Sequence, residues 1–167
     1  MTDEQITLKK WIDESNYIVF FGGAGVSTES NIPDFRSTDG LYNQKYKYPP
    51  ETILSHSFFV QKPEEFYDFY RDKMIYTEAK PNKAHYALAE LEKQGKLKAV
   101  ITQNIDGLHQ AAGSKSVYEL HGTIMKNYCT RCGREYPLST IIESKGIPRC
   151  QVKDETGGVC NGIIKPK

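Results

Sequence analysis

Four cysteines near the C-terminal end of the sequence have a spacing that suits metal binding. Two residues separate Cys129 from Cys132, Cys150 follows after seventeen more, and Cys160 after a further nine. A two-residue gap lets both sulfurs of a pair reach one tetrahedral Zn²⁺ ion at about 2.3 Å, and four thiolates leave no open position for a substrate. The last gap is long, and a Gly-Gly pair within it is expected to let the loop fold back. The pattern predicts a structural zinc site, with free thiols or a redox pair as the alternatives.

A glycine-rich turn follows directly after a short apolar run at residues 17–21 and contains Gly23, Ala24 and Gly25. The run is typical of a strand buried in a parallel sheet, and a strand-to-helix turn can direct free backbone N–H groups at a pyrophosphate. The usual dinucleotide fingerprint is incomplete, because Thr28 takes the place of its third glycine and no second strand ends in an acidic residue about 20 positions later. A plain glycine turn is the alternative for this segment alone.

Polar residues also follow two other expected strands. Gln103, Asn104, Ile105 and Asp106 come after the run at 97–102, and His121 comes after the run at 117–120. Ligands bind outside the carboxyl ends of an open parallel sheet, so these residues and the glycine turn are expected to face one crevice. Asn and Asp can hold ribose hydroxyls or a carboxamide, and a His with a pKa of about 6.5 can take a proton from a hydroxyl. Turn chemistry or helix capping is the alternative for each segment alone.

The loop that carries Asp34, Phe35 and Arg36 lies soon after the glycine turn. Arg36 can pair with a phosphate or with Asp34, and Phe35 can cover a flat heterocycle. A surface loop with an internal salt bridge explains the same residues equally well, so the residues alone do not assign this loop a function.

Helix and strand patterns alternate along the chain, which is typical of an α/β fold. A continuous apolar run predicts a strand at residues 17–21, and the segments 97–102 and 117–120 are expected to be strands because each follows an expected helix. A capping box at Thr2 and helical spacing elsewhere predict helices from residue 2, from residue 63, over 82–94 and over 105–112. Periodicity fades from residue 128 to 163, where a small segment needs a metal to hold it together.

The composition is that of a folded protein without a strong charge imbalance. The 22 Lys and Arg residues nearly balance the 21 Asp and Glu residues, which argues against nucleic acid or an anionic membrane as a partner. The longest strongly apolar run, residues 18–21, is too short to span a bilayer, and the first seventeen residues lack a secretory hydrophobic stretch. A cytoplasmic location with reduced thiols is therefore expected.

Five segments resemble, in order, those of the sirtuins, the NAD-dependent protein deacylases. They are residues 22–27, 32–37, 102–106 and 120–122 and the four-cysteine module. The resemblance covers essentially the whole chain. It implies a Rossmann-like parallel sheet with a small helical insertion and a zinc-binding module, NAD as co-substrate and Zn²⁺ as a structural ion.

The resemblance also implies roles for residues at matching positions. The glycine turn holds the NAD pyrophosphate and a ribose, the loop at 34–36 closes over the nicotinamide end, and the segment 103–106 forms the ribose and nicotinamide contacts. The implied NAD-binding residues are Gly23, Ala24, Gly25, Thr28, Asp34, Phe35, Arg36, Gln103, Asn104, Ile105, Asp106 and His121. His121 is the implied catalytic base, and Asn104 is the second implied catalytic residue.

The activity implied by the resemblance is protein-lysine deacylation on acyl-lysine proteins or peptides. In the family mechanism the acyl oxygen attacks the anomeric carbon as nicotinamide leaves, and the His then activates a ribose hydroxyl, which yields lysine, nicotinamide and O-acyl-ADP-ribose. Sirtuins that favour acidic acyl groups resemble one another in a Tyr-x-x-Arg, but here Lys73 follows Tyr70 at that spacing. An ammonium matches a carboxylate less well than a guanidinium does, so acetyl or another uncharged acyl group is expected.

Residues 1–42 and 81–126 are expected to form the Rossmann-like portion, 43–80 the helical insertion, 127–163 the zinc module and 164–167 the start of a return to the Rossmann portion. Sirtuins continue into further strands and helices. We therefore expect a C-terminally truncated chain whose incomplete sheet exposes an apolar edge and face.

Two other functions compete with deacylation. Mono-ADP-ribosyl transfer from NAD to protein would use the same cleft and the same leaving group. A truncated zinc-stabilised module would bind partners without turning over NAD. A dehydrogenase is disfavoured, because the acidic ribose-binding residue of that fingerprint is not evident.

Overall fold

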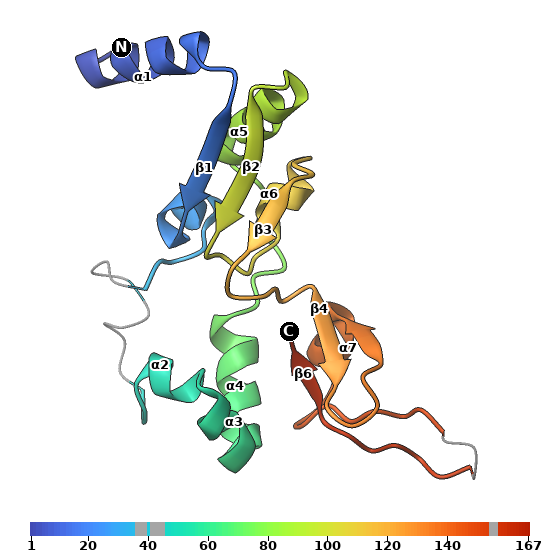
Figure 1. Cartoon of the computed structure of the whole chain (residues 1–167). Helices are drawn as coiled ribbons and strands as arrows, with labels where there is room; N and C mark the ends of the chain where they lie inside the picture. The colour runs from blue at the N-terminus through green and yellow to red at the C-terminus, as the bar shows by residue number, and fades with distance from the viewer. Residues whose placement is uncertain (36–39, 41–45, 154–156) are drawn as a thin grey trace. The chain divides into compact units, whose positions relative to one another are not determined.

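The structure is a computed structural model that describes residues 1–35, 40, 46–153 and 157–167 (Figure 1). The chain folds into two compact units, each with more contacts within itself than with the other. Unit 1 comprises residues 1–32 and 79–121, and unit 2 comprises residues 33–78 and 122–167. Within the described residues, no helix combines the length and the apolar character needed to cross a membrane.

Unit 1 is built on a parallel sheet with the strand order β1-β2-β3. The strands are β1 (Ile18–Gly22), β2 (Leu97–Thr102) and β3 (Val117–Glu119), each within one residue of its predicted bounds. Gly22 pairs with Thr102, and Thr102 pairs with Glu119, so the strands end together at one edge. The Rossmann-like parallel sheet predicted from the sequence is confirmed.

Capping residues mark the ends of two helices of unit 1. They are α1 (Asp3–Glu14), the 3₁₀ helix η1 (Ala24–Ser30), α5 (Lys83–Lys93) and α6 (Leu108–Ala111). The predicted capping box of α1 is present, with the Thr2 side chain accepting from the Gln5 N–H and the Gln5 side chain accepting from the Thr2 N–H. Asn82 caps α5, and Gly95 follows that helix with φ 74°, as its place after the apolar stripe predicts.

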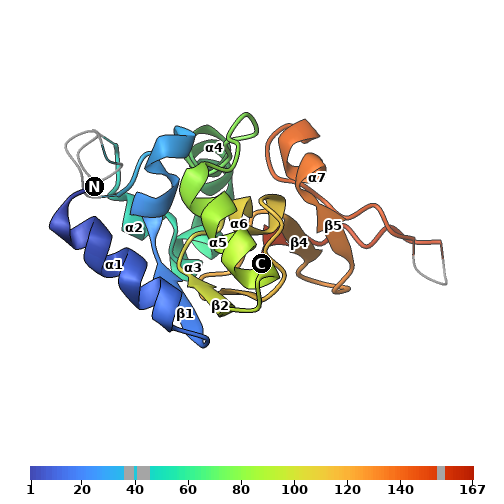
Figure 2. The same ribbon diagram turned by 90° about the horizontal axis from the view of Figure 1, so that it is seen from above.

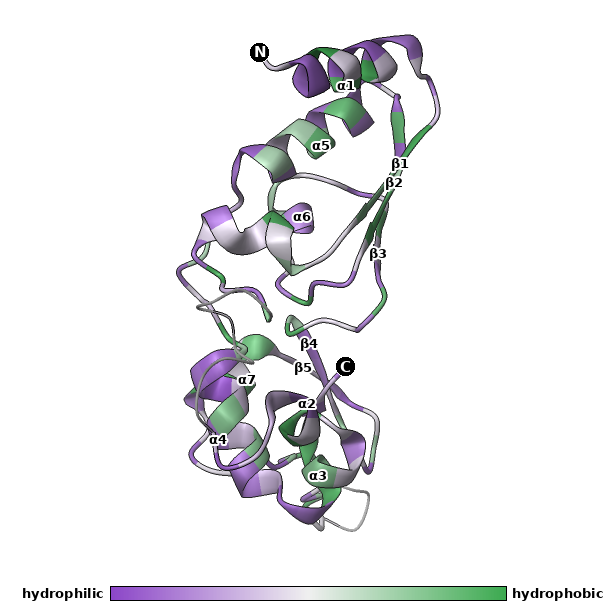
Figure 3. Ribbon diagram, turned by 90° about the vertical axis from the view of Figure 1, so that its left-hand side faces the viewer, coloured by the Kyte–Doolittle hydropathy of each residue, from purple (hydrophilic) through white to green (hydrophobic). Residues whose placement is uncertain are grey.

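Among the described residues of unit 1, helices cover one face of this sheet and none covers the other. Helix α5 packs against β2 (Figure 2), and both α5 and α6 lie on the same side of the strands (Figure 3). On the opposite face, Val19 and Phe21 of β1 and Tyr118 and Leu120 at β3 are each more than half exposed. The described part of the chain therefore has an exposed apolar face on the unit 1 sheet.

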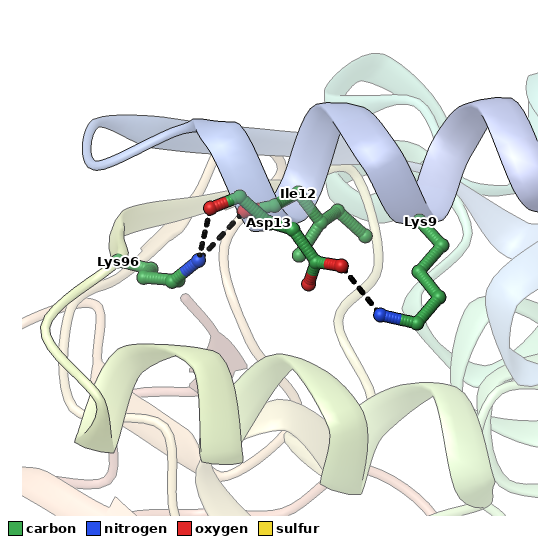
Figure 4. A network of polar contacts seen from close by, with 4 residues as sticks. All are labelled: Lys9, Ile12, Asp13 and Lys96. Carbon is green, nitrogen blue, oxygen red and sulfur yellow. Dashed lines mark hydrogen bonds and ion pairs between the residues drawn. The ribbon is translucent and has the colours of Figure 1, made fainter.

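Helix α1 is held at its C-terminal end by a lysine that is distant in sequence. Lys96 Nζ donates hydrogen bonds to the carbonyls of Ile12 and Asp13, both at 2.9 Å, and Lys9 pairs with the Asp13 carboxylate (Figure 4). The last carbonyls of a helix lack intrahelical donors and carry partial negative charge. The last turn of α1 contains no basic residue, so Lys96 supplies the compensating cation from outside the helix.

Unit 2 combines short helices with an antiparallel sheet of order β5-β4-β6. Its elements are α2 (Pro50–Ile53), α3 (His56–Gln61), α4 (Pro63–Lys73), β4 (Lys126–Cys129), β5 (Glu135–Pro137), α7 (Leu138–Glu143) and β6 (Ile164–Pro166). Helix α4 begins at Pro63 as predicted. The strands were not predicted, because three or four residues are too few to establish a period of two.

Helix α4 is bonded to the segment that carries the cysteines. The buried Tyr67 hydroxyl donates to the carbonyl of Ile164 in β6. Arg71 donates from Nε to the Ile141 carbonyl at 3.0 Å and from a terminal nitrogen to Ser144 Oγ at 2.9 Å. The helical and cysteine-bearing segments of unit 2 therefore share one hydrogen-bonded core.

Candidate functional site

The carboxyl edge of the unit 1 sheet carries the residues that the sequence singled out. Gly23 follows β1, Asn104 lies two residues after β2, and His121 lies two residues after β3. Because the last residues of these strands pair with one another, the three segments begin side by side. This is the edge at which an open parallel sheet binds its ligand.

Ser27 joins the first two of these segments. Its hydroxyl donates to Asp106 Oδ2 at 2.7 Å and accepts from Asn104 Nδ2 at 3.0 Å. Asp106 Oδ1 in turn accepts from the backbone N–H of Leu108 at the start of α6. Sequence reasoning gave Ser27 no role, although it lies in the matched segment 22–27. Its buried hydroxyl fixes both the amide of Asn104 and the carboxylate of Asp106.

The glycine turn is tight because a side chain from the next strand lies against it. A Cβ atom at Gly23 would come within 2.9 Å of Gln103 Oε1, and the Gln103 N–H donates to the Gly22 carbonyl at 2.9 Å. Ala24 begins η1, and the Thr28 hydroxyl donates to the Gly25 carbonyl at 3.0 Å. A Cβ at position 23 would therefore displace the end of the Gln103 side chain, and the backbone at Gly23, with φ −132°, does not itself call for glycine.

Two buried histidines that sequence reasoning missed lie behind this network. The rings of His85 on α5 and His109 on α6 are 4.7 Å apart between centroids, and His85 Nδ1 accepts the backbone N–H of Asn82. Burial lowers the pKa of both; His85 lowers that of His109 further, and Asp106 opposes the shift at each. Both rings are therefore favoured in the neutral form. Their positions on separate helices gave no signal of pairing.

His121 is exposed at this edge. The turn that carries it is held by a hydrogen bond from the Leu120 N–H to the Thr102 carbonyl at 2.9 Å. No hydrogen bond engages its imidazole within the described part of the chain. The imidazole of His121 is therefore open to solvent at the carboxyl edge of the sheet.

The loop expected to cover the ligand belongs to unit 2. Asp34 and Phe35 are both half-buried there. Arg36, predicted to pair with a phosphate or with Asp34, lies outside the described residues. Ile105, by contrast, is half-buried in unit 1 beside Asn104 and Asp106.

The four cysteines converge as predicted. Their Sγ atoms all lie within 4.8 Å of one another, with 3.7 Å between Cys129 and Cys160 and 3.7 Å between Cys132 and Cys150. Sulfurs at about 2.3 Å from a central ion in a regular tetrahedron are about 3.8 Å apart, whereas disulfide sulfurs are about 2.05 Å apart. The cluster therefore fits a structural zinc ion with no open coordination position.

The irregular nine-residue gap is explained by an antiparallel hairpin. Cys150 donates its N–H to the Gly162 carbonyl, Cys160 donates its N–H to the Val152 carbonyl, and Lys153 bridges Val159 further out. In this ladder Cys150 lies opposite Gly162 and Cys160 lies opposite Val152, so the two cysteines come within two positions of each other across the hairpin although their separation in sequence is large. The hairpin therefore brings Cys150 and Cys160 close enough to share one metal ion, as the two-residue gap does for Cys129 and Cys132.

Hydrogen-bond donors favour the thiolate form at two of the four sulfurs, since they lower the pKa of Cys129 and Cys150, whereas burial and the neighbouring cysteines raise the pKa of Cys160 to about 11. The Tyr136 hydroxyl lies 3.0 Å from Cys150 Sγ and donates to it. Burial raises the pKa of Cys150, but Tyr136 and the Val152 N–H lower it to about 7. Gly162 is a further residue of this site that the sequence did not reveal, because a Cβ there would lie 2.6 Å from Cys129 Sγ.

A parallel sheet with polar loops at its carboxyl edge, together with a four-cysteine cluster that fits zinc, is typical of an α/β protein that binds a nucleotide and carries a structural metal site. Comparison with known proteins identifies the family within this class. The model of the Sir2 family matches residues 23–167. The chain belongs to the Sir2 family, as the sequence motifs predicted.

Relatives of known sequence are similar over nearly the whole chain. NAD-dependent protein deacetylases of Clostridium acetobutylicum and Clostridium perfringens are 59% and 57% identical over 99% of this chain and 66% of their own length. One from Sulfolobus acidocaldarius is 46% identical over 99% of the chain and 63% of its own length. The chain thus spans slightly less than two thirds of the curated relatives it matches.

Solved structures agree with this assignment. A structure described as Sir2 bound to acetylated peptide has 40% identity and a TM-score of 0.78 over 99% of this chain and 63% of its own. A Sir2 structure with a deacetylated peptide and 3′-O-acetyl-ADP-ribose has 42% identity and a TM-score of 0.82 over 100% of this chain and 64% of its own.

Proposed function

We propose that this protein is an NAD-dependent protein-lysine deacetylase that releases nicotinamide and O-acetyl-ADP-ribose. The observation that carries the proposal is the hydrogen-bonded set of Ser27, Asn104 and Asp106 at the carboxyl edge of a Sir2-family sheet. The relatives named NAD-dependent protein deacetylase, and the Sir2 structure that holds an acetylated peptide, support it.

In this proposal NAD supplies a nicotinamide–ribose bond whose cleavage leaves an electrophilic carbon for the acetyl oxygen. The amide oxygen is a weak nucleophile, so the site must align it and stabilise positive charge on the ribose. Asp106 brings a carboxylate held in one orientation, which suits that charge, and Asn104 offers an amide for polar groups of the ligand.

His121 acts in the proposal as the general base. It takes a proton from a ribose hydroxyl and so allows that oxygen to attack the carbon that came from the acetyl group. Its exposure at the end of β3 supports this role. The turn at Gly23, Ala24, Gly25 and Thr28 contributes the surface for the pyrophosphate, and Gln103 a ribose contact, as the family resemblance implies.

The cysteine module, with proposed bounds 127–163, has a structural part in this function. Its closed ligand set holds β4 and the hairpin together and offers no site for substrate. The predicted bounds of the Rossmann-like portion and of the helical insertion are part of the same proposal.

An uncharged acyl group is the favoured substrate. Lys73 lies where sirtuins that prefer acidic acyl groups have Arg, and its ammonium forms an ion pair with Asp72 at 3.0 Å. A lysine already paired with a carboxylate is a weaker partner for a second one. We also propose a cytoplasmic location, because the four thiols lie at ligand distances rather than disulfide distances.

Incubation with an acetyl-lysine peptide and NAD labelled in the adenosine part tests the proposal. We expect labelled O-acetyl-ADP-ribose in proportion to the deacetylated peptide. Label fixed covalently to protein would instead identify mono-ADP-ribosyl transfer. Binding of the peptide without consumption of NAD would identify a non-enzymatic binding module.

A further inference from the structure

Asn82 makes more contacts than a helix cap requires. Its Oδ1 accepts from the Ala84 N–H at 2.9 Å, which is the capping bond of α5. Its Nδ2 donates to the Val26 carbonyl at 2.7 Å and to Ser30 Oγ at 3.0 Å, and both of these residues belong to η1. The orientation of the amide is unambiguous, because the Ala84 N–H can only donate and the Val26 carbonyl can only accept.

Helix η1 needs such support. It is a 3₁₀ helix of seven residues, whereas runs longer than about three or four are uncommon because the hydrogen bonds are poorly aligned. The residue that caps its C-terminal end is Asn31, a non-glycine residue in the left-handed region with φ 60°. Bonds from outside the helix, at Val26 and Ser30, therefore stabilise a conformation that its own sequence favours weakly.

Val26 and Ser30, the two residues that Asn82 holds, lie on either side of Ser27, which orients Asn104 and Asp106. Ser27 lies directly after Val26, and its hydroxyl holds both Asn104 and Asp106. The backbone N–H of Asn82 also donates to His85 Nδ1, which ties the start of α5 to the buried histidine pair behind Asp106. A displacement of η1 would therefore reach Asn104 through Ser27.

We propose that Asn82 is a positioning residue for the dinucleotide site: through its amide nitrogen it holds η1 so that Ser27 fixes Asn104 and Asp106. The expected effect of Asn82 on ligand binding rests on the proposed function, whereas its expected effect on η1 does not. Asn82 touches neither substrate nor reacting atoms in this role.

Substitutions at position 82 separate the capping bond from the bonds to η1. Ser and Asp both cap helices about as well as Asn. Asn82→Ser removes the two donors, and Asn82→Asp replaces them with an oxygen that faces the Val26 carbonyl, acceptor against acceptor. Thr2→Ala is the matched control, because it removes an N-cap from α1 in the same unit without touching η1. A capping role alone predicts no loss for Ser or Asp.

Two measurements on the purified protein decide the inference. Amide hydrogen exchange without ligand should be faster at residues 25–31 in Asn82→Ser, faster still in Asn82→Asp, and unchanged there in Thr2→Ala. The dissociation constant for ADP-ribose, measured by calorimetry, should rise roughly fivefold to tenfold in Asn82→Ser, which corresponds to loss of about one or two hydrogen bonds, and further in Asn82→Asp. In turnover, KM for NAD should rise, and kcat should fall as well because the same displacement reaches Asn104 and Asp106 through Ser27.

The outcomes keep the two proposals apart. Unchanged exchange at 25–31 in both Asn82 variants, or equal acceleration there in Thr2→Ala, would overturn the inference. So would unchanged ADP-ribose affinity in variants of a protein that binds it. If even the unsubstituted protein fails to bind ADP-ribose, the proposed function fails, and the exchange data still accept or reject the hold on η1.

Discussion

Ser27 donates a hydrogen bond of 2.7 Å to the carboxylate of Asp106, a residue 79 positions further along the chain. The bond joins the turn after β1 to the loop after β2, and the Asn104 amide completes it. A polar contact between the ends of two neighbouring parallel strands therefore turns two separate loops into one surface.

Ser27→Ala should weaken both the fold and the proposed site. It leaves Asp106 Oδ2 and Asn104 Nδ2 without the partner that Ser27 provides, at a cost of about 1–3 kcal/mol in the free energy of unfolding. Denaturant unfolding and the rate of deacetylation measure the two effects. Thr7→Ala, which removes an exposed hydroxyl on α1, should change neither. Full stability in Ser27→Ala would show that the network is not formed.

His121→Ala should lower kcat for deacetylation by about 10²–10⁴-fold while leaving the dissociation constant for NAD largely unchanged, since the base acts on a proton rather than on binding. Product formation and calorimetry are the two readouts. The control is His56→Ala, an exposed histidine in unit 2. Retained turnover in His121→Ala would remove that residue from the base role.

The histidine pair should make stability depend on pH. An unfolded imidazole has a pKa of about 6.5, and burial lowers the pKa of His85 and His109 in the fold. The unfolded chain then binds more protons, so this contribution is complete above about pH 6.5 and is lost as the pH falls below it. Unfolding free energies at pH 7.5 and 5.5 should differ less in His109→Leu than in the unsubstituted protein. An equal difference in both would contradict the argument.

Removal of metal should lower thermal stability and solubility before it changes any chemical step. Closed thiolate sites contribute folding energy, so chelation or Cys129→Ser should lower Tm. Gly162→Ala should weaken zinc binding, because its Cβ would lie 2.6 Å from Cys129 Sγ. Zinc content and melting curves check both changes. An intact melting curve after complete metal removal would exclude a structural role.

The exposed apolar face of the unit 1 sheet should make the chain self-associate. Phe21 and Tyr118 lie in register on that face across Ile101. Phe21→Lys or Tyr118→Lys should reduce binding of a hydrophobic dye and the light scattering of concentrated samples. Val60→Lys, at an exposed valine on α3, is the control. No difference from the control would show that the face is covered in solution.

Short-range patterns in the sequence were enough to predict much of the fold. Residues 97–102 became β2 without a shift, because they follow Gly95 at the end of a predicted helix in the helix-to-strand order typical of an α/β fold. Thr2 with Gln5, and Gly95 after α5, act within a few residues of chain, so their type and spacing were sufficient. The spacing of the four cysteines likewise predicted a metal site, because few other roles suit such a set of thiols.

Tertiary structure alone decided what depends on contacts between distant segments. Lys96 reaching the end of α1, Asn82 holding η1 and His85 beside His109 each join residues whose local sequence looks ordinary. Ser27 likewise acquires its partners only when β1 and β2 lie side by side. Periodicity and capping predict the local helix or strand to which a residue belongs. A hydrogen bond between distant segments depends instead on where their backbones meet in the folded chain.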